Sequence, residues 1–95
     1  MTVPRRYVAN PLVSCGDEGA DGALLFNPDT DDSAIINPTG RAIWGLIATP
    51  HTVDEIADHL VTTFRGVSTE QAAQDALQFI QALTPGLVLE VDDDA

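Results

Sequence analysis

The feature that most constrains the fold is a pair of capped helical segments in the C-terminal half. Thr52 is followed three residues later by Glu55, the spacing of a capping box in which each side chain accepts a hydrogen bond from the other residue's backbone N–H. A similar pair, Ser68 and Gln71, precedes the second segment. Apolar residues then recur at helical spacing: Val53, Ile56, Ala57, Leu60, Val61 and Phe64 in the first segment, and Ala72, Ala73, Ala76, Leu77, Phe79, Ile80 and Leu83 in the second. These patterns predict two amphipathic helices, ended by Gly66 and by Pro85-Gly86.

The N-terminal half has the pattern of short strands. The apolar runs 23–26 and 33–36 are each ended by Asn-Pro and are separated by polar turn residues, which suits an antiparallel hairpin. Two more extended segments, 7–9 and 12–15, flank Asn10-Pro11, and the proline favours an edge or bent strand. The composition of residues 16–22, rich in glycine and acids, predicts a loop.

The periodicity changes at Asn37. Asn37 suits a helix N-cap and Pro38 the first helical position, and apolar residues at helical spacing follow as far as Thr49-Pro50. Residues 87–91 predict a last extended segment. A small antiparallel sheet followed by three short helices suits an α+β fold of the winged helix-turn-helix type.

The charge of the chain argues against two classes of partner. It has 15 acidic residues and four arginines but no lysine, so its net charge is −11. Binding to nucleic acid or to an anionic membrane needs clustered cations, and neither is expected as a partner. Ten acids fall in residues 17–32 and 90–94, where they suit a solvated surface, with steering of a basic partner as the alternative. Without a signal peptide pattern or a bilayer-length apolar run, the expected location is the cytoplasm.

Residues that could support catalysis are few. Cys15 stands alone, and His51 and His59 are eight positions apart, too far to share a metal ion easily. The acidic run that begins at Asp29 lacks the glycine and glutamate spacing of an EF-hand loop. We therefore expect no metal, no cofactor and no catalytic residue. Trp44 is expected to pack in or beside the core, with a partner contact as the alternative.

The ordered set of motifs resembles the PqqD family, also called RiPP recognition elements. The resemblance rests on Ala23–Pro28, on Ile35–Trp44 with its Asn37-Pro38-Thr39-Gly40 helix start, on the Thr52–Leu60 helix and on Gly86-Leu87-Val88. It covers residues 7–91 as one domain, between a flexible N-terminus (1–6) and an acidic tail (92–95). The Ile43-Trp44 pair is also similar to the small stand-alone B-type proteins of lasso peptide clusters.

The resemblance implies a winged helix-turn-helix fold with a three-stranded N-terminal antiparallel sheet, three helices and no catalytic activity. It also implies binding of the leader segment of a ribosomally made precursor peptide. The leader would add as a strand to the edge of the third strand, in a groove closed by the third helix, and would be presented to a radical SAM enzyme, a cyclase or a leader peptidase. In this chain the implied peptide-binding residues are Ser33, Ala34, Ile35, Ile36, Asn37, Ala72, Asp75, Ala76 and Phe79.

Two details of this interpretation depend on the third helix. Small alanines at 72 and 76 would leave room for leader side chains, although close packing on the sheet is the alternative. Asp75 could select a basic or hydrogen-bond-donating leader residue. Two other functions stay open: a winged-helix DNA-binding regulator, opposed by the lack of Lys and Arg in residues 69–84, and a small acidic subunit that binds a folded enzyme through the Trp44 region.

Overall fold

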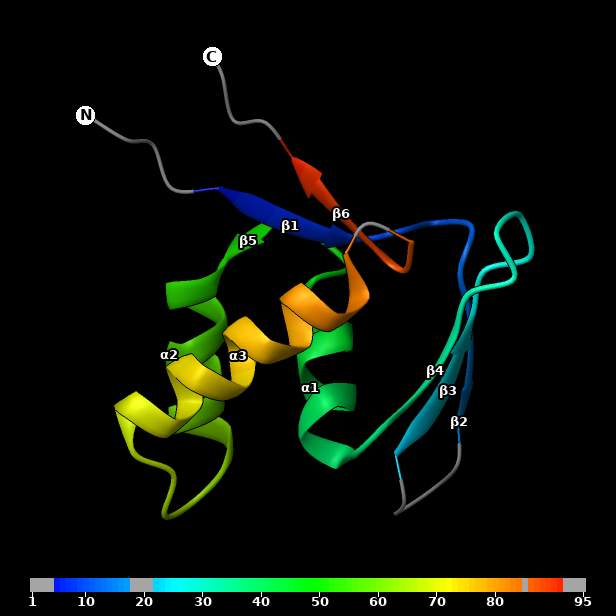
Figure 1. Cartoon of the computed structure of the whole chain (residues 1–95). Helices are drawn as coiled ribbons and strands as arrows, with labels where there is room; N and C mark the ends of the chain where they lie inside the picture. Colours follow the sequence, from blue (N-terminus) through cyan, green and yellow to red (C-terminus); the bar gives the residue numbers. More distant parts are fainter. Residues whose placement is uncertain (1–4, 18–21, 85, 92–95) are drawn as a thin grey trace.

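The structure is a computed structural model that describes residues 5–17, 22–84 and 86–91. The expected acidic tail at 92–95 and most of the expected flexible N-terminus lie outside these residues, and Arg6 already belongs to a strand. The elements in chain order are β1 (Arg6–Ala9), β2 (Ser14–Asp17), β3 (Ala23–Phe26), β4 (Ser33–Ile36), α1 (Pro38–Leu46), β5 (His51–Thr52), α2 (Val53–Thr63), α3 (Thr69–Leu83) and β6 (Val88–Val91) (Figure 1).

The strands form two antiparallel sheets. One has the order β2-β3-β4, and the other has the order β5-β1-β6. The α+β class and the small N-terminal sheet with three helices are therefore confirmed, but the strand order differs from the expected one. β1 leaves the N-terminal sheet and pairs with β6, from the far end of the chain, because the turn at Asn10-Pro11 redirects the chain between β1 and β2. That turn is closed by a 3.0 Å hydrogen bond from the Val13 N–H to the Asn10 carbonyl.

The first two helices start where the sequence predicts. The Asn37 side chain accepts a 2.7 Å hydrogen bond from the Gly40 N–H, with Pro38 in the first turn of α1. The Thr52–Glu55 capping box of α2 is complete, with bonds of 3.1 and 2.8 Å. The Thr52 backbone N–H that donates to the Glu55 carboxylate lowers the pKa of Glu55, since this bond favours the charged form.

The second predicted capping box is only half formed. Ser68 caps α3 by accepting a 3.1 Å bond from the Gln71 N–H, as expected. The Gln71 side chain does not return to Ser68: its Nε2 atom donates to Oδ1 of Asp75, one turn further along, at 2.9 Å. This i,i+4 bond holds the Asp75 carboxylate on the surface of α3.

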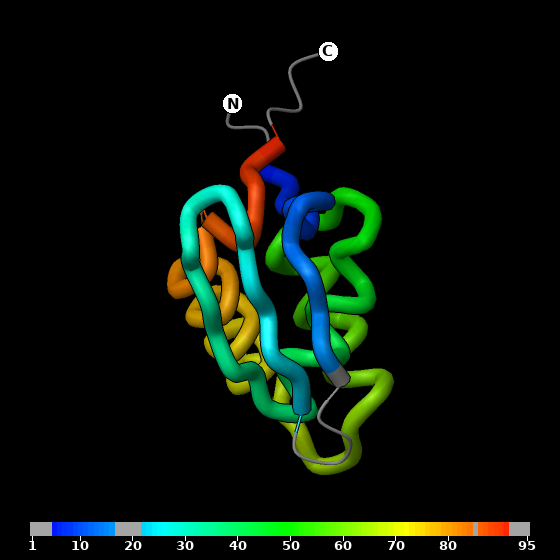
Figure 2. Tube along the Cα trace, turned by 90° about the vertical axis from the view of Figure 1, so that its right-hand side faces the viewer, coloured from blue at the N-terminus to red at the C-terminus, as the bar shows by residue number. Residues whose placement is uncertain are grey.

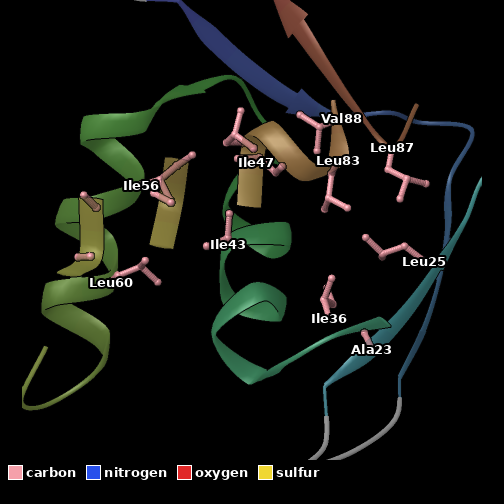
Figure 3. Close-up of a cluster of buried hydrophobic side chains, with 14 residues drawn as sticks. Ala23, Leu25, Ile36, Ile43, Ile47, Ile56, Leu60, Leu83, Leu87 and Val88 are labelled. Carbon is pink, nitrogen blue, oxygen red and sulfur yellow. The ribbon is translucent and has the colours of Figure 1, made fainter. Parts of the chain in front are cut away.

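The hydrophobic core lies between the β2-β3-β4 sheet and the three helices (Figures 1 and 2). Figure 3 shows Leu25 and Ile36 of the sheet pointing toward Ile43 of α1, while Leu83 and Val88 close the core beside β6. The sheet thus packs its inner face on the helices and leaves its outer face uncovered (Figure 2). No helix in the described part of the chain is long and apolar enough to cross a membrane.

One buried polar residue, Asn27, ties the β3–β4 hairpin to the turn after α3. Its side chain is 2% exposed, donates to the Gly86 carbonyl at 2.8 Å and accepts from the Asp29 N–H at 2.9 Å. Its backbone N–H also donates to the Asp32 carbonyl at 2.8 Å. The sequence showed Asn27 only as the end of a strand, because the partner at Gly86 is distant in the chain.

We expect Asn27→Ala to lower the free energy of unfolding by about 1–2 kcal/mol, because the Asp29 N–H loses its acceptor and the Gly86 carbonyl keeps only the 3.2 Å bond from the Asn10 side chain. Urea denaturation followed by circular dichroism measures this loss. Gln74→Ala, at an exposed position of α3, is the matched control and should change stability by less than about 0.5 kcal/mol. A loss at Asn27 no larger than that of the control would contradict the structural role of this side chain.

Candidate functional site

The site is built on β4, which is an edge strand of its sheet. In an antiparallel pair, residues that exchange backbone hydrogen bonds alternate with residues that do not. The Asn27 N–H donates to the Asp32 carbonyl, and the register then places the next bonded pairs at Leu25–Ala34 and Ala23–Ile36. It follows that Ala34 and Ile36 direct their N–H and C=O groups toward β3. Ser33 and Ile35 direct theirs away from the sheet.

The side chains of β4 alternate in a second sense, between the two faces of the sheet. Ile36 is buried and Ala34 half-buried on the inner face, against the helices. Ile35 lies on the outer face and is 82% exposed, the largest exposure among the described large apolar residues. A residue that is both apolar and this exposed, on a strand with a free edge, is unusual for a surface that stays uncovered.

A groove of about 400 Å³ runs between the edge of β4 and α3. Figure 2 shows β4 at the side of the sheet where α3 lies. The groove is lined by β4, the start of α1 and one face of α3: Ala34, Ile35, Ile36, Asn37, Thr39, Gly40, Ile43, Asp75, Gln78, Phe79, Ala82 and Leu83. A second hollow, of about 340 Å³, shares Ala34, Ala82 and Leu83 with the groove and extends it toward Asp32 and Thr84.

Gly40 sets how closely α1 and α3 approach at this groove. A Cβ atom at this position would lie 3.0 Å from Cβ of Ile36 and 3.1 Å from Cε2 of Phe79, both tighter than ordinary contacts. The absence of a side chain at Gly40 therefore lets the Phe79 ring lie against the first turn of α1. The ring and Ile36 together give the groove an apolar surface beneath the strand edge.

The structure brings together six of the nine residues that the sequence predicted for peptide binding. Ala34, Ile35, Ile36, Asn37, Asp75 and Phe79 line the groove, and Ser33 lines the second hollow. Ala72 and Ala76 were wrongly placed on the groove wall: both are 0% exposed and pack in the core. Both alanines therefore pack closely in the core without a ligand, as the alternative interpretation expects, and do not line the groove.

The error comes from the rotation of α3 about its axis. Residues 72, 76, 80 and 83 form its buried stripe, and the groove face is the neighbouring stripe at 75, 78, 79 and 82. Sequence reasoning missed Gln78 and Ala82, although both follow Asp75 and Phe79 at helical spacing and could have been added from them. It also missed Thr39, Gly40, Ile43 and Leu83, for which only the fold gives a signal.

The groove carries one charged side chain among the described residues that line it, that of Asp75. Asp75 is half-buried, and its Oδ1 atom accepts from Gln71. A ligand in this groove therefore meets apolar side chains such as Ile36 and Phe79, uncharged polar groups of Asn37, Thr39 and Gln78, and a carboxylate on the α3 wall. This arrangement can bind an extended apolar segment and a cation or hydrogen-bond donor.

Other residues considered from the sequence lie away from this groove. Cys15 is exposed on β2, His51 hydrogen-bonds the Thr49 carbonyl, and His59 faces Thr63 along α2. Trp44 is half-buried against the core, which confirms the packing role expected for it. Within residues 5–17, 22–84 and 86–91, no three His, Cys, Asp or Glu side chains come together to hold a metal ion.

Comparison with known proteins bears on the fold and the family. The family model described as coenzyme PQQ synthesis protein D (PqqD) matches residues 22–84. Among solved structures, the chain is similar to lasso peptide synthetase B1 complexed with the leader peptide, with a TM-score of 0.68 and 19% sequence identity. That match covers 87% of this chain and 96% of the other. No curated protein sequence matches.

Proposed function

We propose that this chain, which belongs to the PqqD family, is a non-catalytic adaptor that binds the leader segment of a ribosomally made precursor peptide. The observation that carries the proposal is the free edge of β4 above a groove that α3 closes and that has apolar surface at Ile36 and Phe79. The similar fold of lasso peptide synthetase B1, whose structure contains a leader peptide, supports it.

Binding would occur by strand addition. The outward N–H and C=O groups of Ser33 and Ile35 are a template on which an extended peptide can form main-chain hydrogen bonds. Alternate side chains of the added strand would then enter the groove over Ile36 and Phe79. The main-chain bonds supply affinity for any extended segment, and the groove supplies selection among sequences.

The charge of the protein favours a leader that is not acidic. The net charge is −11, and Asp75 adds a carboxylate to the groove itself. A basic or hydrogen-bond-donating leader residue beside Asp75 would pair with this carboxylate, while an acidic residue there would be repelled.

The adaptor would hold the leader while a modifying enzyme acts on the rest of the precursor. A radical SAM enzyme, a cyclase and a leader peptidase are the candidate partners, and precursor synthesis on ribosomes makes the cytoplasm the expected place of binding. The chemistry would belong to the partner, because Cys15, His51 and His59 lie away from the groove. Binding of DNA by α3 is disfavoured, since Thr69–Leu83 contains no Lys or Arg.

The test is amide hydrogen exchange, measured by NMR, with a synthetic peptide that carries the leader segment of a candidate precursor. In the free protein we expect slow exchange at Ala34 and Ile36, whose N–H groups bond β3, and fast exchange at Ser33 and Ile35. Saturating leader should slow exchange at Ile35 by more than about tenfold, because its N–H gains a partner in the added strand.

A scrambled peptide of the same composition is the control and should leave Ile35 unprotected. The proposal fails if the leader does not bind, or if it binds and Ile35 exchanges as fast as in the free protein. In the second case the leader would lie elsewhere on the surface, and the residues whose amides change would show where.

A further inference from the structure

The outer face of the β2-β3-β4 sheet carries a row of exposed apolar side chains that the groove does not account for. Leu24 and Phe26 of β3 are 40% and 39% exposed, and Ile35 of β4 is 82% exposed. Their neighbours Ala23 and Leu25 on the same strand are completely buried on the inner face. The row is therefore not part of the core. Because side chains alternate along a strand, Leu24, Phe26 and Ile35 lie on the outer face of the sheet, opposite the buried Ala23, Leu25 and Ile36.

The row runs across the strands and ends at the free edge. Leu24 and Ile35 are directly opposed in the antiparallel register, and Phe26 lies two residues further along β3 on the same face. In a strand added to β4, the residue opposed to Ile35 would share this outer face, with its Cβ atom about 5 Å from that of Ile35. Its two neighbours would point to the inner face and the groove.

We propose that the leader is recognised on both faces of the sheet, and that Ile35 selects an apolar residue at the leader position opposed to it. This inference rests on the proposed strand addition and adds a second set of contacts to it. The leader side chain beside Ile35 would extend the apolar row by one strand. A β-branched or aromatic residue fits best, since such residues pair well across strands.

The placement of Ile35 favours the leader strand as the occupant of this surface. This residue lines the groove and also ends the outer row, so a strand seated in the groove covers it without any further partner. A second copy of the chain, paired edge to edge, would cover Ile35 too. Two chains of net charge −11 repel each other, and that pairing is disfavoured.

The test compares Ile35→Thr with the wild-type protein by fluorescence anisotropy of the labelled leader. Threonine keeps the β-branched shape and the backbone N–H but makes the outer position polar. We expect about fivefold weaker binding. In an alanine scan of the leader, the wild-type protein should lose affinity at leader positions that face the groove and also at positions that face outward. For Ile35→Thr, the alanine substitution at the outward position opposed to residue 35 should no longer weaken binding. Leu89→Thr, an exposed strand position in the other sheet, is the matched control and should bind as wild type.

Each outcome separates this inference from the function it rests on. If the wild-type protein does not bind the leader, the proposed function and the outer-face recognition are both contradicted. If the leader binds and protects the Ile35 amide but Ile35→Thr binds equally well, strand addition stands and outer-face recognition is overturned. Unchanged sensitivity of Ile35→Thr at every leader position also overturns it. A third outcome would overturn it as well: sedimentation velocity could show that the wild-type protein is a dimer and that Ile35→Thr is a monomer. A second copy of the chain would then occupy the row.

Discussion

Replacing Ile35 with proline should weaken leader binding by about 30- to 100-fold in a protein that remains folded. The N–H of Ile35 points away from β3, so proline removes no hydrogen bond of the sheet, and prolines are tolerated on edge strands in this orientation. In the complex, however, the leader carbonyl that would accept from Ile35 loses its donor while it is shielded from water. A buried acceptor without a partner costs about 1–3 kcal/mol, and the proline ring adds a steric obstacle.

Two matched variants separate this cause from others. Ile35→Ala keeps the N–H and removes the side chain, and it should bind more tightly than Ile35→Pro. Ala34→Pro, one position earlier, removes an N–H that bonds β3 and should lower the melting temperature markedly. Thermal melts and leader titrations of the three variants provide the comparison. An Ile35→Pro protein that melts like wild type and binds with unchanged affinity would exclude the β4 edge as the leader site.

The starts of the three helices are features that neighbouring residues in the sequence can predict. The caps at Asn37, Thr52 and Ser68 were predictable because each bond joins residues three positions apart. The strand at 33–36 was also predictable from local sequence, because a short apolar run there is bounded by turn residues. Six of the predicted groove residues follow from these elements together with the family resemblance.

The pairing of β1 with β6 had no local signal. It joins Arg6 to Val91 across almost the whole chain, and nothing within either segment specifies the partner. The wall of the groove was partly wrong because helical spacing gives a stripe but not its rotation. The apolar face of α3 is broad, and only the burial of Ala72 and Ala76 in the core shows which part of it packs inward. The buried Asn27 was missed because its partner Gly86 is far along the chain.

Gly22→Ala should have the largest effect on stability among alanine substitutions of the glycines that the structure describes. Gly22 has φ = +115°, a conformation that residues with a side chain rarely adopt. A Cβ atom there would lie 1.8 Å from the Ile36 carbonyl oxygen. No side-chain rotation can relieve this contact, because the backbone fixes the position of the Cβ atom and the oxygen is itself a backbone atom. We expect the free energy of unfolding to fall by more than about 3 kcal/mol, which is a large fraction of the total free energy of unfolding of a small domain.

Gly45→Ala is the matched control, because the same methyl group is added to a helix where nothing lies within 4 Å of it. This variant should gain about 0.5–1 kcal/mol, the opposite sign, since alanine is the better helix former. Urea denaturation of both variants tests the contrast, and a Gly22→Ala protein as stable as Gly45→Ala would contradict the close approach. Because the group displaced in Gly22→Ala is the backbone of Ile36, any fraction that stays folded should also bind leader more weakly. Gly45→Ala should bind as wild type, which would connect the stability of this strand end to the groove that it lines.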